Sequence, residues 1–389
     1  MKHAIAVTFF VFGFLAVFEL ASATDSPVPE PFQRFDDTSK YTISYADLTN
    51  LLKIAVVNVG RSTREKAAPS RAATGTRMTS KVKRTTANEG NRFYYETFDN
   101  NEEAQQILID IQKSLEQLPA EVPLEYFSRD EQLAYWLNLY NVTLLNEIIK
   151  VYPQRNLKKL LVGKKSVLSK KILNVAEVPL SLNDFQYTIL KINYDNDPLV
   201  IYGLYQGIIG GPNIRRTAYT GSDVRRALKN NANEFVNSNR GTYSRNEKVF
   251  RVSSLYDRNR VFFPDFNTDL SNHLLTYVEE PERSELRSAS VLKPDINDWT
   301  VTDLGGTNRD LGAVFADNNA ALLDSVKSTN TVDGTVMGAS VGAGSSSMAA
   351  NGRFCASCSD EIVITFVCIP CGGGIRPCRD LQALRDTQE

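Results

Sequence analysis

The distribution of cysteine and histidine constrains this 389-residue chain more than any motif does. All of its Cys lie in the last 35 residues, at positions Cys355, Cys358, Cys368, Cys371 and Cys378. Its two His are His3 and His273, so residues 24–354 contain one His and no Cys. A Cys–His nucleophilic pair cannot form within that region, and a Ser-His-Asp triad there could use only His273.

The first 23 residues have the features of a secretory signal peptide. Lys2 precedes an apolar run from Ala4 to Phe18, and Ala21-Ser22-Ala23 matches the small-residue cleavage pattern. An uncleaved membrane anchor is the alternative, and the polar TDSPVPEPF after Ala23 favours cleavage. No other segment approaches the roughly 20 apolar residues of a membrane span. We therefore expect a secreted, extracellular protein without a membrane span, in which loss of His3 also excludes a zinc site with several His ligands.

Composition indicates a globular chain, because 42% of the residues are hydrophobic and 23% are charged. The net charge of -1 gives no reason to expect nucleic acid or an anionic membrane as a partner. The chain divides into a leader, one domain with a basic, Ser/Thr/Ala-rich insertion that we expect to be disordered, a helix with a Gly/Ser-rich linker, and a Cys-rich tail. The leader covers 24–40 and the domain 41–305, with the insertion at 61–90. The helix with its linker covers 306–350, and the tail covers 351–389.

Apolar residues at helical spacing predict that the domain is rich in helices. Ser128 and Glu131 fit a capping box at the start of one of them. Alternating residues predict short strands near 91–98 and 248–257, and Leu199–Ile201 resembles a buried strand. The expected fold is therefore α+β: a helix-rich single globular domain with a small sheet. The expected helices cover residues 45–59, 101–118, 128–148, 180–192, 222–238 and 269–280.

A resemblance to a known family rests on five blocks that occur in a fixed order. They are DEQLAYWLNLYNVTLLNEIIKVYP, VPLSLNDFQYTILK, DPLVIYGLYQGIIGGPNIRRTAYTGSDVRRAL, VSSLYD and NDWTVTDL. Together they resemble the domain of unknown function 547 family from about Tyr41 to Leu304, interrupted at 61–90. That family has no established activity. Its members commonly carry a Glu and a His in the second block, and a His and a Cys in the third, a set that would suit a thiol hydrolase.

This chain departs from the family pattern at each of those four places. By the resemblance, Gln186 stands for the Glu, Tyr187 for the first His, Ile201 for the second His and Gln206 for the Cys. None of these side chains supplies a thiolate, an imidazole or a carboxylate. The glycine-rich segment, residues 197–215, also contains no Cys, His, Ser, Thr, Lys or Glu. We assign no catalytic residue. We expect the glycine-rich segment to keep the shape of an active-site loop without its reactive side chains.

Polar residues within YWLNLYN form the most distinctive cluster of the domain. Asn138 or Asn141, on the buried side of a helix, is expected to hold the backbone of a neighbouring loop rather than a ligand. Asn141-Val142-Thr143 is a possible glycosylation site, although its place in an apolar helix predicts that it is unmodified. We interpret the lone His273 as structural and Arg215-Arg216 as solvated rather than anion-binding.

Two pairs of carboxylates are visible and could in principle support glycoside hydrolysis. They are Asp130 with Glu131, and Asp195 with Asp197. The first pair is better explained as charges in the first turn of a helix, where they favour the helix dipole.

The tail carries the strongest chemical signal. Cys355 and Cys358 form one close pair, and Cys368 and Cys371 form another after nine residues. Four thiolates in two pairs suit tetrahedral zinc, whereas secretion favours disulfides. Cys378 makes the count odd and allows a disulfide-linked dimer.

The expected function is that of a secreted, non-catalytic binding or structural protein whose partner is an unknown protein or small ligand. One alternative is an extracellular hydrolase with an unidentified catalytic group. Another is a tail-mediated zinc-binding or disulfide-linked interaction protein. Zinc in the tail is the only cofactor that the sequence suggests.

Overall fold

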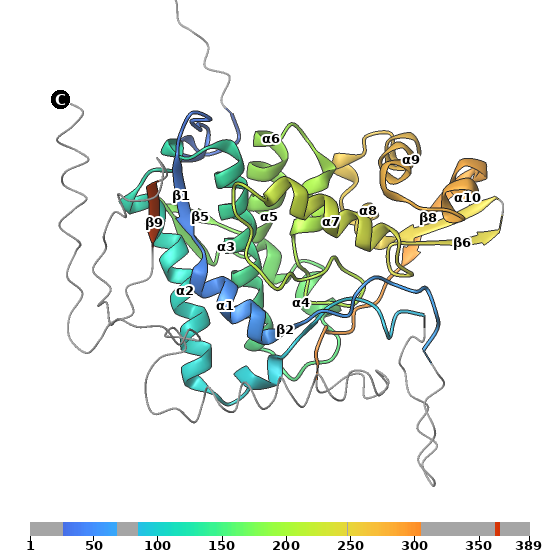
Figure 1. The fold of residues 1–389 in the computed structure, drawn as a ribbon, viewed down its shortest axis with the longest axis horizontal. Helices are drawn as coiled ribbons and strands as arrows, with labels where there is room; N and C mark the ends of the chain where they lie inside the picture. Colours follow the sequence, from blue (N-terminus) through green and yellow to red (C-terminus); the bar gives the residue numbers. More distant parts are fainter. Residues whose placement is uncertain (1–25, 68–84, 247, 305–361, 366–389) are drawn as a thin grey trace, which may run out of the picture.

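The computed structural model describes residues 26–67, 85–246, 248–304 and 362–365 (Figure 1). The signal peptide predicted at 1–23, the segment at 306–350 and all five Cys lie outside the described residues. The helices are α1 (Ala46–Ala55), α2 (Glu102–Glu121), α3 (Arg129–Ile149), α4 (Lys158–Leu161), α5 (Leu182–Asp184), α6 (Lys191–Asn193), α7 (Val224–Val236), α8 (Ser254–Arg258), α9 (Phe266–Tyr277) and α10 (Glu282–Ser288). The strands are β1 (Tyr41–Ser44), β2 (Val56–Val57), β3 (Arg92–Phe93), β4 (Leu173–Val175), β5 (Val178–Leu180), β6 (Thr242–Asn246), β7 (Val249–Ser253), β8 (Val291–Ile296) and β9 (Ile362–Thr365).

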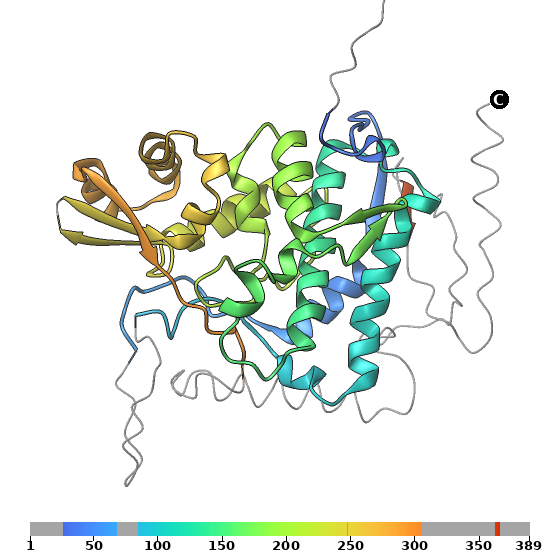
Figure 2. The same cartoon turned by 180° about the vertical axis from the view of Figure 1, so that it is seen from behind.

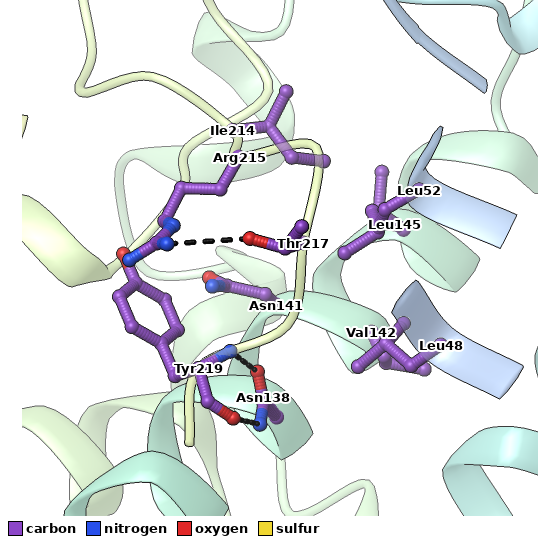
Figure 3. A pocket seen from close by; sticks show the side chains of 10 residues that line it. All are labelled: Leu48, Leu52, Asn138, Asn141, Val142, Leu145, Ile214, Arg215, Thr217 and Tyr219. Atoms are coloured by element: carbon purple, nitrogen blue, oxygen red, sulfur yellow. Dashed lines mark hydrogen bonds between the residues drawn. The ribbon is translucent and has the colours of Figure 1, made fainter. Parts of the chain in front are cut away.

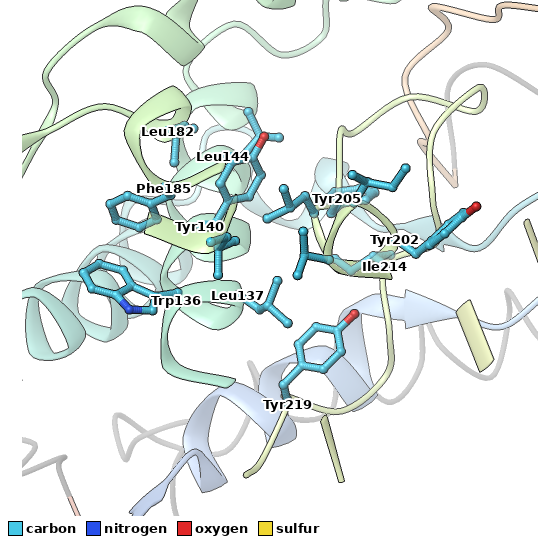
Figure 4. Packing of buried hydrophobic residues seen from close by; sticks show 14 of the residues in the cluster. Trp136, Leu137, Tyr140, Leu144, Leu182, Phe185, Tyr202, Tyr205, Ile214 and Tyr219 are labelled. Atoms are coloured by element: carbon cyan, nitrogen blue, oxygen red, sulfur yellow. The ribbon is translucent and has the colours of Figure 1, made fainter. Parts of the chain in front are cut away.

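Helix α3 lies at the centre of one continuous hydrophobic core. Sixteen of its 21 residues are buried, which requires neighbours on every side of the helix. Those neighbours include α2, α7, β1 and a π-helix (Phe185–Leu190) that joins α5 to α6. The ring of Trp136 meets Phe32 and Phe185 edge-on at centroid distances of 5.0 and 4.8 Å. Figure 4 shows Trp136 beside Phe185 within this core. The many helices and the small sheets confirm a helix-rich α+β domain.

The described strands form four small sheets. Three of them have two strands: β1 pairs with β9 in parallel, and the pairs β2–β3 and β4–β5 are antiparallel. The fourth has the order β6-β7-β8 and lies with α9 and α10 at the opposite end of the molecule from β1 and α2 (Figures 1 and 2). The core of the domain is therefore formed by elements packed around α3, and the largest sheet lies at the edge of the domain.

The glycine-rich segment begins as a 3-10 helix (Pro198–Gly203), so the expected strand at Leu199–Ile201 is wrong. The Asp197 carboxylate accepts a hydrogen bond from the Leu199 amide at 2.8 Å and starts the helix. A Cβ at Gly203 would come within 2.6 Å of Leu228 and 2.8 Å of Leu137, which belong to α7 and α3. The glycine here permits close packing of the core rather than approach of a ligand.

Both ends of the segment expected to be a disordered insertion pack on the domain, which corrects its bounds. Glu89, at 4% exposure, and its neighbours Thr86 and Ala87 are buried. Arg64, near the other end, donates to the Thr242 carbonyl at 2.7 Å and pairs with Glu282 at 3.3 Å. Long-range contacts fix residues 61–67 and 85–90 even though their composition is polar. Residues 68–84 lie outside the described part of the chain.

Candidate functional site

Three of the four positions that depart from the family pattern meet at the end of α8. The side-chain amide of Gln186 donates to the Asn259 side chain. The Tyr187 hydroxyl donates to the Arg258 carbonyl at 3.3 Å, and the oxygen of Gln206 accepts from the Arg258 guanidinium at 2.7 Å. We call these five residues the Arg258 cluster. The fourth position, occupied by an isoleucine, is buried in the hydrophobic core.

Arg258 is the charged centre of this cluster, and no sequence pattern pointed to it. Its guanidinium also donates to Ser254 at 2.9 Å and lies 4.8 Å from the ring centre of Trp299. Burial lowers the pKa of Arg258, although an arginine remains charged. Among the described ion pairs none includes Arg258, and the neighbouring Asp257 pairs with Arg260 at 2.7 Å.

The Arg258 cluster contains no group that could act as a nucleophile or general base at neutral pH. Glutamine and asparagine do not titrate in this range, and burial raises the pKa of Tyr187 further above its ordinary value. Tyr140, which lies near the cluster, has its pKa raised by burial as well. The arrangement can hold an anion or donate hydrogen bonds, but it cannot perform the thiol chemistry that the family pattern would suit.

A second group of charges contacts the glycine-rich segment at Gly211. Arg240, which is 1% exposed, donates to the Gly211 carbonyl at 2.6 Å and to both oxygens of Glu234. Its Nε lies 3.8 Å from the carboxylate of Glu89. Arg92 donates to the carbonyls of Ala87 and Glu89, both at 2.7 Å. These residues, Arg240, Glu234, Glu89 and Arg92, form the Arg240 network.

Electrostatics in the Arg240 network follow from its burial. Desolvation raises the pKa of Glu89, against the attraction of Arg240. Desolvation also lowers the pKa of Arg92 to about 10, with repulsion from Arg240 as the next contribution. Each guanidinium has a carboxylate or several carbonyls against it. The network therefore ties three chain segments together, and the polar atoms in it that make no hydrogen bond, Glu89 Oε2, Arg92 Nε and Arg240 Nε, are buried.

His273 does not belong to a catalytic triad in the described structure. Its Nε2 lies 2.9 Å from the hydroxyl of Tyr202, and the two rings stack at 5.7 Å. The Tyr202 hydroxyl in turn contacts the hydroxyl of Tyr256 at 3.1 Å. Burial lowers the pKa of His273 to about 4, so the imidazole is neutral at pH 7. Its surroundings are aromatic, which agrees with the structural interpretation.

The asparagines of YWLNLYN hold loop backbone, as the sequence predicted. Asn138 donates to the Tyr219 carbonyl at 2.8 Å and accepts from the Tyr219 amide at 2.9 Å (Figure 3). Asn141 donates to the Gly203 carbonyl at 3.0 Å and accepts from the Tyr205 amide at 2.9 Å. Because the Asn141 nitrogen is used in this way, we still expect it to carry no glycan.

A cavity of about 20 Å³ lies between α1, α3 and residues 214–219 (Figure 3). This volume suits one or two water molecules and excludes a metabolite. Arg215 reaches its wall but pairs with Asp223 at 3.2 Å and covers the Tyr219 ring at 4.9 Å. Arg216 donates to the Lys53 carbonyl at 2.9 Å. The two arginines therefore bind the protein itself, and the interpretation of both as solvated is wrong.

The carboxylate pairs serve structural contacts as well. Asp130 pairs with Arg225 at 2.8 Å, and Asp195 pairs with Arg129 at 2.7 Å. Ser128 accepts from the Glu131 amide at 3.2 Å, as a capping box requires.

The Glu131 carboxylate, however, accepts from two backbone amides of distant segments rather than from the helix start. The capping box is therefore wrong in its second half. Burial raises the pKa of Glu131 while these hydrogen bonds lower it.

The described residues contain no group of three His, Cys, Asp or Glu side chains that could hold a metal ion. The four Cys proposed as zinc ligands lie outside them, so zinc in the tail remains a prediction. The part of the tail that is described, β9, pairs with β1 from Tyr41↔Ile362 to Ser44↔Thr365. No helix within the described ranges is long and apolar enough to cross a membrane.

Comparison with known proteins gives one match. Residues 124–236 match the family model described as "Protein of unknown function, DUF547". All four positions that depart from the family pattern lie within this range, whereas Arg258 and Trp299 lie beyond it. No curated protein and no solved structure matches the chain.

Proposed function

We propose that this chain, which belongs to the DUF547 family over residues 124–236, is a secreted, non-catalytic binding or structural protein. One observation carries the proposal: the positions where the resemblance expects Glu, His, His and Cys hold side chains without that chemistry. Gln186 and Gln206 are bonded to Asn259 and Arg258 instead. These are the contacts of a packed protein interior, with no nucleophile or base among them.

The nearest titratable groups support the same function. His273 is held by Tyr202 and lacks a carboxylate to orient it, in contrast to the histidine of a triad. Glu89 and Glu234 are bound to Arg240. A hydrolase would have to use one of these groups after breaking its present contact, and we therefore rank the hydrolase below the non-catalytic function.

A stability measurement tests this function without knowledge of a substrate. Groups that serve catalysis are often held at the expense of stability, so replacing them is neutral or stabilising. Groups that serve packing lose stability when replaced. We expect Gln186→Ala to lower the free energy of unfolding by about 1–3 kcal/mol, because it leaves the Asn259 side chain without its partner in the interior.

The matched control is Gln106→Ala, which removes an exposed glutamine bonded to Asp110 within α2. Its expected cost is below about 0.5 kcal/mol. Urea denaturation of both variants gives the comparison. A stabilised Gln186→Ala protein, or turnover of ester, amide or peptide substrates by the wild-type chain, would overturn the non-catalytic function.

The tail is the second candidate for function. Its strand β9 pairs with β1, and in the sequence this strand falls between the two Cys pairs. Zinc binding and a disulfide-linked dimer are distinguished by intact-mass spectrometry of the chain secreted from eukaryotic cells. A native mass with one zinc and free thiols after denaturation would support a metal module. A dimer split by reductant would support covalent association. The same masses would show whether cleavage follows Ala23.

A further inference from the structure

We propose that Arg258, together with Trp299 and Gln206, is a binding site for the carboxylate group of a ligand. The site deepens the proposed binding function and rests on it. Three observations lead to it: a guanidinium without an anionic partner, a set of unused donors, and partial exposure of the residues around it. All three concern the same guanidinium, that of Arg258.

The charge of Arg258 is not compensated within the described residues. Asp257, which is next to it in the chain, pairs with Arg260 instead. The partners of the guanidinium are Ser254 and Gln206, which are both neutral. Burial disfavours the charged form, and the nearby Asp257, which pairs with Arg260, offsets only part of that cost. An anion that bound here would supply the missing charge.

Unused donors remain on the same guanidinium. An arginine carries five N–H groups. One goes to Ser254 and one to Gln206, so three are left in the described structure. A planar fork of this kind matches the two oxygens of a carboxylate, and such a pair is among the stronger hydrogen-bonded contacts in proteins.

The surroundings determine how a ligand would approach. Trp299 covers the guanidinium at 4.8 Å, so the open direction is the edge that carries the N–H groups. Arg258, Tyr187 and Trp299 are each partly exposed, and Gln206 lies deeper at 9% exposure. A single positive charge in a neutral, partly aromatic setting balances a single negative charge. This favours a carboxylate over a doubly charged phosphate group.

Tryptophan fluorescence can report on the site directly. The chain has two Trp, and Trp136 is completely buried in the core, whereas Trp299 lies on Arg258. The full-length chain is titrated with sodium acetate and with N-acetyl-triglycine, at an ionic strength held constant with sodium chloride. We expect a saturable change in emission. N-acetyl-triglycine amide, which lacks the carboxylate, should give none.

Three variants define the origin of the signal. Arg258→Lys keeps a charge but removes the fork, and we expect binding to weaken at least about tenfold. Gln206→Glu places a carboxylate of the protein on Arg258, so that added carboxylate should no longer bind. Arg260→Gln removes a neighbouring charge that pairs with Asp257 and should bind as the wild type does. Circular dichroism confirms that each variant is folded.

The outcomes separate this site from the proposed function. Absence of a saturable change, or a change that persists in both Arg258→Lys and Gln206→Glu, would overturn the carboxylate site and leave the non-catalytic function intact. Equal binding of inorganic phosphate would overturn the choice of carboxylate. Cleavage of the peptide, detected by mass spectrometry after the titration, would overturn the non-catalytic function while the site stands. Stronger binding of the peptide acid than of acetate would support the site and assign it to chain termini.

Discussion

Two arginines contact the glycine-rich segment, Arg258 at Gln206 and Arg240 at Gly211, and they differ in which groups surround their charge. Arg240 is almost completely buried, and its guanidinium contacts Glu234, Glu89 and the Gly211 carbonyl. Arg258 is only half-buried and contacts neutral oxygens and an aromatic ring. The Arg240 guanidinium is enclosed by carboxylates and a carbonyl, whereas the Arg258 guanidinium still has N–H groups that could bind an anion.

This difference indicates where a function can remain in a chain that lacks the reactive residues implied by its resemblance to the DUF547 family. The Arg240 network fastens the segment to β3 and α7 and would be costly to open. Where the resemblance implies a set suited to thiol chemistry, the Arg258 cluster holds glutamine and tyrosine, and the guanidinium has no carboxylate paired with it. The Arg240 network holds the segment at Gly211, while the guanidinium available to a ligand contacts it at Gln206.

The largest effect is expected when the enclosed charge is removed. Arg240→Met leaves the buried Glu89 and Glu234 carboxylates without their cation, and should lower the free energy of unfolding by about 3–5 kcal/mol. Arg258→Met leaves no paired carboxylate without its cation, and should lower the free energy of unfolding by about 1 kcal/mol or less. Urea denaturation of both proteins measures the difference. Equal costs would contradict the distinction between the two arginines.

The cost of Arg240→Met should also depend on pH, because Glu89 titrates. Burial raises the pKa of Glu89, and Arg240 partly opposes that rise. Without Arg240 the pKa rises further, so the variant gains stability as pH falls through it, when Glu89 takes up its proton. We expect the cost of Arg240→Met to shrink by about 1 kcal/mol between pH 7 and 5.

Arg258→Met is the control for this pH effect, since the described residues around Arg258 include no carboxylate paired with it. Its cost should be constant over the same range. His273 contributes equally to both proteins: its lowered pKa of about 4 removes stability from each as pH falls below about 6.5. The titration of His273 therefore cancels when the stability costs of the two variants are compared. A cost of Arg240→Met that grew at pH 5 would contradict the role assigned to Glu89.

Local patterns in the sequence predicted much of the fold. The apolar spacing of α3 and the Ser128 cap are both observed, and so is the role of Asn138 in holding loop backbone. These features depend on residues close together in the chain or on which face of one helix is apolar. The short apolar run at 199–201 was read as a strand because runs of that length do not distinguish a strand from a helix.

Long-range contacts account for what the sequence missed. Glu131 bonds the amide of Ile43, 88 residues away, in place of its own helix start. Glu89 is bonded by Asn239, 150 residues away, which fixes an end of the segment expected to be disordered. Arg258 meets Gln206 across 52 residues. Local sequence patterns do not predict contacts between residues so far apart in the chain. The candidate site could therefore be identified only from the structure.

The smallest expected effect is a gain. Gln206→Glu would give Arg258 the carboxylate that it lacks, replacing a neutral hydrogen bond by a charge-assisted one. The improved bond is worth about 1–2 kcal/mol, and burying the new charge offsets part of it, so we expect a net stabilisation of about 1 kcal/mol at pH 7. Because Arg258 lowers the pKa of the new carboxyl group, the gain should disappear as pH falls through that lowered pKa. Thermal and urea denaturation at pH 7 and at about pH 2.5 measure the gain in stability, because the lowered pKa lies below the ordinary Glu value of about 4.3. A destabilised Gln206→Glu protein would mean that the charge of Arg258 is already satisfied, and would make the two arginines alike.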